Sequence, residues 1–130
     1  MTGNVEYSKE VMKNFFNPKN MGEIKNPSGV GEVGNARCGD VMKVFIKVVK
    51  KDGNEILKDV KFKTFGCVAA IASSSMVTQL TKGKTLEEVK KVKMKDVEEA
   101  LKGLPKIKLH CASMAIQGLG KAIKEYEGKN

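Results

Sequence analysis

The chain lacks tryptophan and has only 5% aromatic residues, so its core has to be built mainly from aliphatic side chains and methionine. It also lacks any apolar run near the roughly 18 residues that a membrane-spanning helix needs, and we expect no membrane association. The first residues, MTGNVEYSKE, have neither the pattern of a signal peptide nor that of a transit peptide. These absences lead us to expect a cytoplasmic protein.

Arginine is almost absent, although the formal net charge is +9. Arg37 is the sole arginine, and the lysines are spread along the whole chain. Base readout and stacking on nucleic acids favour arginine and clustered aromatic residues. We therefore expect no nucleic-acid partner, and interpret the basic surface as one that attracts acidic proteins.

Cysteine is scarce and odd in number, with three residues, which argues against a closed framework of disulfides. In a reducing compartment such cysteines are core thiols, metal ligands or nucleophiles. A length of 130 residues fits one domain. We expect a single domain over residues 1–130, with residues 1–7 as a mobile N-terminus and 127–130 as a short tail.

The hydrophobic pattern predicts strands first and helices afterwards. A helix over 7–18 with Ser8 as N-cap is followed by a loop, a short strand around 30–33 and a hairpin over 40–65 with its turn at Asp52-Gly53. Helices are predicted over 67–83, 84–92, 94–104 and 111–128, and 104–109 reads as extended. The expected fold class is α+β, a small antiparallel sheet with helices packed on one face and N-terminal and C-terminal helices flanking it.

Each cysteine falls at a predicted junction between a loop and an element. Cys38 precedes a strand, while Cys67 and Cys111 start helices, where unpaired N–H groups and the macrodipole favour a thiolate. Asp40 follows Cys38 by two positions, and His110, the single histidine, precedes Cys111. These five residues are candidate ligands of one metal centre. Three thiols are one fewer than a 2Fe–2S cluster usually takes, so Asp40, His110, an external thiol or a second chain would complete the shell.

Four motifs carry a resemblance to a known family over nearly the whole chain. They are YSKEVMKNFFNPKNMGEI, GNARCGDVMKVFIKV, KTFGCVAAIASSSMVTQLTKGKTLEE and LPKIKLHCASMAIQGLGKAI. In this order they resemble the IscU/NifU-type iron–sulfur cluster assembly scaffolds, the NifU N-terminal domain family. The family fold, a three-stranded antiparallel sheet with packed helices, agrees with the pattern above.

The resemblance implies a scaffold and carrier and not an enzyme. Sulfur would arrive as persulfide from a cysteine desulfurase, iron would be added, and the 2Fe–2S cluster would pass to apo acceptor proteins. By motif, Cys38, Cys67 and Cys111 are cluster ligands with His110 or Asp40, Cys111 is the persulfide acceptor, and Asp40 governs cluster turnover. The resemblance also implies zinc in the cluster-free form and a ferredoxin or iron donor as a further partner.

The chain departs from the family at several positions. Lys106 stands where relatives that use an Hsp70-type chaperone have a second proline, which puts that partner in doubt, and Val68 replaces a frequent glycine. The residues leave open whether the cluster lies within one chain or at a homodimer interface. The main alternative is a zinc-bound, persulfide-accepting sulfurtransfer protein of the same fold, against which the retained His110 argues. A Cys-His hydrolase and a structural zinc domain are weaker alternatives.

Overall fold

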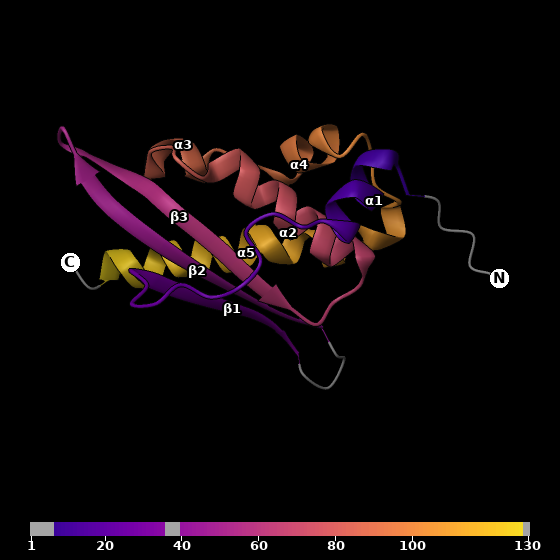
Figure 1. The fold of residues 1–130 in the computed structure, drawn as a ribbon, viewed down its shortest axis with the longest axis horizontal. Coiled ribbons are helices and arrows are strands. Elements are labelled where there is room, and N and C mark those ends of the chain that lie inside the picture. The colour runs from indigo at the N-terminus through magenta and orange to yellow at the C-terminus, as the bar shows by residue number, and fades with distance from the viewer. Residues whose placement is uncertain (1–6, 36–39, 129–130) are drawn as a thin grey trace.

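The computed structural model describes residues 7–35 and 40–128, and of Asn35 and Asp40 it describes the backbone only. Three strands, β1 (Gly29–Asn35), β2 (Asp40–Lys51) and β3 (Asn54–Thr64), form an antiparallel sheet in the order β1-β2-β3. Helix α1 (Lys9–Phe16) precedes them. The helices α2 (Val68–Thr81), α3 (Leu86–Lys90), α4 (Met94–Ala100) and α5 (Leu109–Gly128) follow (Figure 1).

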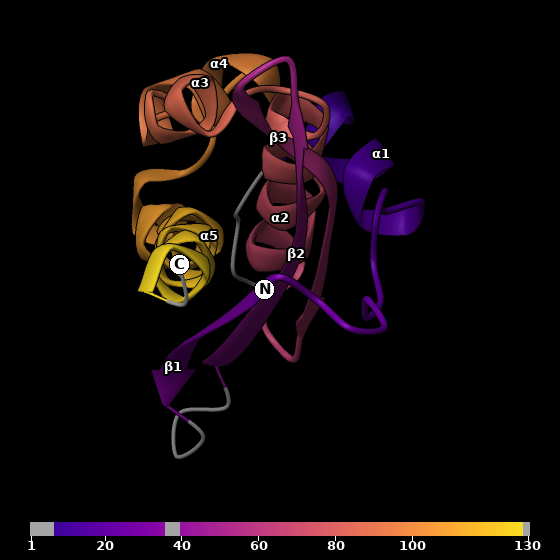
Figure 2. The ribbon, with the colours of Figure 1, turned by 90° about the vertical axis from the view of Figure 1, so that its left-hand side faces the viewer.

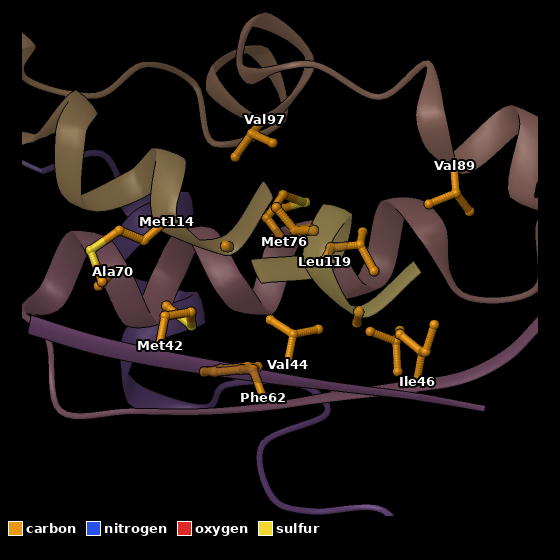
Figure 3. Packing of buried hydrophobic residues seen from close by; sticks show 14 of the residues in the cluster. Met42, Val44, Ile46, Phe62, Ala70, Met76, Val89, Val97, Met114 and Leu119 are labelled. Carbon is orange, nitrogen blue, oxygen red and sulfur yellow. The ribbon is translucent and has the colours of Figure 1, made fainter. Parts of the chain in front are cut away.

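The sheet buries one face under the two longest helices. Met42, Val44 and Ile46 alternate along β2, and Phe62 lies opposite Val44 on β3; all four are at most 3% exposed. Helices α2 and α5 lie side by side over this face (Figures 1 and 2), and their apolar side chains meet those of the strands in one core (Figure 3). The predicted α+β class with a three-stranded antiparallel sheet is confirmed.

Helix α5 packs unusually close to β1 because glycines meet at the contact. A Cβ on Gly31 would come within 2.0 Å of the Gly118 carbonyl oxygen, and one on Gly29 within 2.2 Å of the Ala122 carbonyl oxygen. Gly118 in turn leaves room for Val44, whose Cγ2 would be 2.8 Å from an added Cβ. These positions therefore exclude larger residues, which fixes the helix on the sheet.

Polar side chains hold α1 to α2. The Ser75 hydroxyl and the Gln79 amide both donate to Oδ1 of the buried Asn14, each over 2.7 Å. Past the end of α1, the Lys19 N–H donates to the Ser75 hydroxyl oxygen over 2.9 Å, and the Asn20 amide donates to the Thr78 hydroxyl oxygen over 2.9 Å. The serine- and threonine-rich middle of α2 is thus a binding surface for α1 and the segment that follows it.

The predicted turns and caps agree with the structure at most positions. Ser8 caps α1 by accepting from the Val11 N–H, and Thr85 with Glu88 forms the predicted capping box of α3. Asp52 and Gly53 have positive φ and join β2 to β3. Tyr7 packs against the core, and Glu127 lies within α5, so neither has the free position expected from the sequence.

The segment 104–109 was expected to be extended, and that expectation is wrong. Pro105 has extended backbone, but Lys106–Lys108 form a 3-10 turn, η2, that leads directly into α5 at Leu109. Proline disfavours helix at the residue before it and in a helix interior, but it is well suited to the start of a helix. The last helix therefore begins two residues earlier than Cys111.

Candidate metal and sulfur site

Cys67 occupies the N-cap position of α2, with extended backbone and a half-buried side chain. The loop before it is tied to the sheet. The Phe65 N–H and the Thr64 hydroxyl both donate to the Val41 carbonyl oxygen, over 3.2 and 2.8 Å, and the Gly66 N–H donates to Thr64 Oγ1 over 2.9 Å. The start of β2 therefore lies against the loop that carries Cys67.

Cys111 is the third residue of α5 and is half-buried, packed against the same core as Cys67. His110 is exposed, and its carbonyl oxygen accepts from the Ser113 hydroxyl over 2.8 Å. Consecutive side chains on a helix diverge by about 100°. The two neighbours thus have different surroundings, the thiol against the core and the imidazole in solvent.

Tyr7 interacts electrostatically with both cysteines. Burial raises the pKa of the Tyr7 hydroxyl; the Lys108 ammonium lowers it, and the Cys67 and Cys111 thiols raise it further. The Tyr7 hydroxyl thus interacts with the charges of all three groups, and Tyr7, Cys67 and Cys111 all pack against the same hydrophobic core. Cys67 at the N-cap of α2 and Cys111 in the first turn of α5 are thus both linked electrostatically to Tyr7 and packed against one core.

The sequence analysis missed Tyr7 and Lys108 as members of this site. Tyr7 lies sixty positions before Cys67 along the chain, and no spacing rule connects it to any cysteine. The sequence pattern assigns Lys108 only to the extended segment 104–109. Only the packing of α1 against α2, and of α2 against α5, places these groups beside the thiols.

The structure does not describe the side chains of two of the five candidate ligands. Cys38 lies outside the described residues, and Asp40 is described through its backbone alone, paired with Asn35 at the start of β2. That position adjoins Val41, the residue bonded to the Cys67 loop. Within residues 7–35 and 40–128, no three His, Cys, Asp or Glu side chains are grouped so as to hold a metal ion.

The surface around the thiols carries apolar side chains in solvent. Phe65, two residues before Cys67, is 84% exposed, and Ile107, four residues before Cys111, is 78% exposed. Beside Tyr7 an open hollow of about 460 Å³ is bordered by Lys102, Leu104 and Pro105.

None of the helices in the described part of the chain is long and apolar enough to cross a membrane.

Comparisons with known proteins agree on the family. The iron–sulfur cluster assembly scaffold protein IscU 1 of Archaeoglobus fulgidus is 52% identical over 124 residues, covering 95% of this chain and 78% of that protein. The IscU scaffold protein of Aquifex aeolicus is 45% identical, covering 93% of this chain and 76% of its own length.

A solved structure with a similar fold is that of a nitrogen-fixing NifU-like protein, N-terminal part, from Brucella abortus. Its TM-score is 0.67 at 19% identity, and the match covers 94% of each chain. Residues 6–130 of the present chain match the family described as the NifU-like N terminal domain. The chain therefore belongs to the NifU-like N-terminal domain family.

Proposed function

We propose that this protein is a scaffold on which 2Fe–2S clusters are assembled from iron and desulfurase-derived sulfur and then passed to apo acceptor proteins. The observation that carries the proposal is that two cysteines far apart in sequence begin the two longest helices, both half-buried against one core. The 52% identity to a protein named as an IscU scaffold supports the same function.

The ligands we propose are the thiolates of Cys38, Cys67 and Cys111, with Asp40 or His110 as the fourth protein ligand. Thiolates are the preferred ligands of iron–sulfur clusters, and four are usual. A carboxylate or imidazole in the fourth place binds iron less firmly than a thiolate. A cluster held this way can leave the scaffold, which suits a donor of clusters.

Cys111 is the residue that we propose accepts sulfur from a cysteine desulfurase. Its thiolate attacks the outer sulfur of the donor's persulfide, a new S–S bond forms on Cys111, and the donor cysteine leaves as a thiolate. Reduction of this sulfur to sulfide takes two electrons, which a ferredoxin or another electron donor has to supply. The half-buried position of Cys111 in the first turn of α5 leaves part of its side chain accessible to a partner.

Partners are expected to dock around the thiols. The exposed Phe65 and Ile107 offer apolar contacts there, and Lys106 and Lys108 offer positive charge. Lys106 in place of proline makes the Hsp70-type chaperone an open question, and a homodimer that shares one cluster is a further arrangement to test. Zinc would bind the same ligands when no cluster is present.

The first experiment is anaerobic reconstitution with iron and sulfide, with iron and sulfide counted alongside the mass of the loaded species. Two irons per chain in a monomer would indicate a cluster within each chain, and one iron per chain in a dimer would indicate a shared cluster. Cys111→Ser is expected to abolish loading, while Ser113→Ala, a matched change on the same turn, is expected to preserve it. Absence of colour in the unmodified protein would favour the zinc-bound sulfurtransfer alternative.

Asp40 needs its own test because its proposed role is in release of the cluster. Asp40→Ala is expected to lengthen the lifetime of the loaded cluster and to slow its transfer to an apo ferredoxin. Loss of the folded state, measured by circular dichroism, would instead make Asp40 a structural residue and contradict the proposal for it.

A further inference from the structure

A second concave site lies away from the thiols, between α3 and α5 and above α2. Its volume is about 290 Å³, near the lower end of the range for small-molecule pockets. Val77 of α2, Val89 of α3 and Ile116, Leu119 and Ile123 of α5 form its walls. In Figure 2, α3 and α5 lie on the same side of α2.

Gly120 keeps the groove open. It faces the groove near the middle of a 20-residue helix, where glycine costs about 1 kcal/mol relative to alanine. The close packing that explains Gly118 does not apply here, because a Cβ on Gly120 would meet no atom within 4 Å. The space that a side chain would occupy is therefore part of the groove.

Charged side chains border the apolar walls. Lys90 and Glu127 form an ion pair of 2.6 Å between α3 and α5, so their charges compensate each other. Lys124 also borders the groove, and among the described residues it has no carboxylate within ion-pair distance. The groove thus combines an apolar floor with one uncompensated positive charge.

We propose that this groove binds a medium-chain aliphatic carboxylate, with the alkyl chain along Val89, Ile116 and Gly120 and the carboxylate at the Lys124 ammonium. Burial of apolar surface supplies the binding free energy, and the ammonium selects the charged end. A protein partner would have to cover surface well beyond this groove of about 290 Å³, since a stable protein interface buries about 800 Å² on each side. The proposal does not depend on the function proposed for the cysteine site.

The test is a titration of the ¹⁵N-labelled full chain with octanoate, followed by amide chemical shifts. Saturable shifts are expected at Val92, Ile116 and Gly120. The unmodified protein should bind 1-octanol about threefold more weakly than it binds octanoate. Lys124→Gln should bind octanoate about threefold more weakly than the unmodified protein does, because threefold is about the contribution of one exposed ion pair. Lys95→Gln, which changes an exposed lysine on α4, should bind octanoate as the unmodified protein does.

A second pair of variants tests the groove itself. Gly120→Leu fills it and is expected to abolish the shifts, whereas Gln117→Leu adds the same side chain to α5 outside the groove and should leave them unchanged. Circular dichroism shows whether both variants are folded. The proposal is overturned if Gly120→Leu binds octanoate normally, if the shifts fall outside the groove, or if raising the protein concentration alone produces them, since a second copy would then be the occupant.

Discussion

At the scale of single residues, glycine has different structural roles at two neighbouring positions of α5. Gly118 and Gly120 are two residues apart on α5, yet one faces the sheet and the other faces the groove. A Cβ on Gly118 would meet Val44 at 2.8 Å, while a Cβ on Gly120 would meet nothing. The sequence shows only that both weaken the helix; their surroundings decide what a substitution does.

Gly120→Ala is therefore expected to stabilise the protein by about 1 kcal/mol, because alanine loses less backbone entropy in a helix. Gly118→Ala gains the same helix propensity but forces Val44 to move, and is expected to be destabilising overall by up to about 2 kcal/mol. Urea unfolding of the two variants measures both. Equal effects of the two changes would show that a Cβ at Gly118 fits beside Val44 without strain.

Glu88 gives a residue-scale prediction about pH. Hydrogen bonds from the Thr85 backbone N–H and hydroxyl hold the pKa of Glu88 below its ordinary value of 4.5. The unfolded chain therefore takes up a proton first as the pH falls, so this contribution to stability is present above about pH 4.5 and is lost below it.

Glu88→Gln should accordingly lower stability at pH 7 and have little effect near pH 3, as measured by urea unfolding at the two pH values. Glu87→Gln, on the same turn but outside the capping box, serves as the control. A Glu88→Gln effect that is equal at both pH values would contradict the assigned role of the ionised carboxylate.

At the scale of elements, polar contacts decide how firmly α1 is attached. The amide of Asn14 donates to the Glu10 carbonyl oxygen over 2.8 Å and accepts from Ser75 and Gln79 on α2. Asn14 is only 5% exposed, so breaking this set leaves polar groups without partners inside the protein. Since Tyr7 precedes α1 directly, this attachment also fixes its position beside the thiols.

Asn14→Ala is expected to cost about 1–3 kcal/mol, because the Ser75 hydroxyl and the Gln79 amide lose a buried acceptor. Hydrogen exchange in α1 should rise more than in α5. Lys13→Ala, an exposed neighbour on the same helix, should change neither quantity noticeably. Because Asn14 and Ser75 share one bond, the double variant Asn14→Ala/Ser75→Ala should cost less than the sum of the two single changes.

At the scale of the whole molecule, the candidate ligands of the proposed metal site come from separate parts of the chain. Cys67 starts α2, Cys111 lies in the first turn of α5, and Asp40 starts β2, bonded through Val41 to the Cys67 loop. A metal that uses ligands from all of these parts binds the folded chain better than the unfolded one. Metal binding and stability are therefore linked.

Zinc should raise the free energy of unfolding, by about 2.7 kcal/mol when free zinc is a hundredfold above its dissociation constant. Thermal unfolding with and without a chelator measures the effect, and Cys111→Ser should remove most of it. An unchanged melting temperature in the unmodified protein would mean that the thiols do not form a metal site in the folded chain.

The sequence by itself determined most of the elements and the family. Alternation along 40–65 predicted the hairpin, Ser8, Thr85 and Glu88 marked helix starts, and the cysteine motifs predicted the family that the comparisons confirm. These features are local, because caps, turns and periodicity depend on residues a few positions apart. The prediction failed at 104–109, where a proline was read as a sign of extension although it begins a helical turn.

Only the tertiary structure decided which distant residues share a site. The packing of α1 on α2 and of α2 beside α5 brings Tyr7 and Lys108 to Cys67 and Cys111, and the glycines of β1 and α5 set how closely the last helix approaches the sheet. The groove at Gly120 arises in the same way, from three helices that meet without filling the space between them. The physical reason is that such contacts depend on how whole elements pack, and no periodicity within one element encodes the neighbour it will meet.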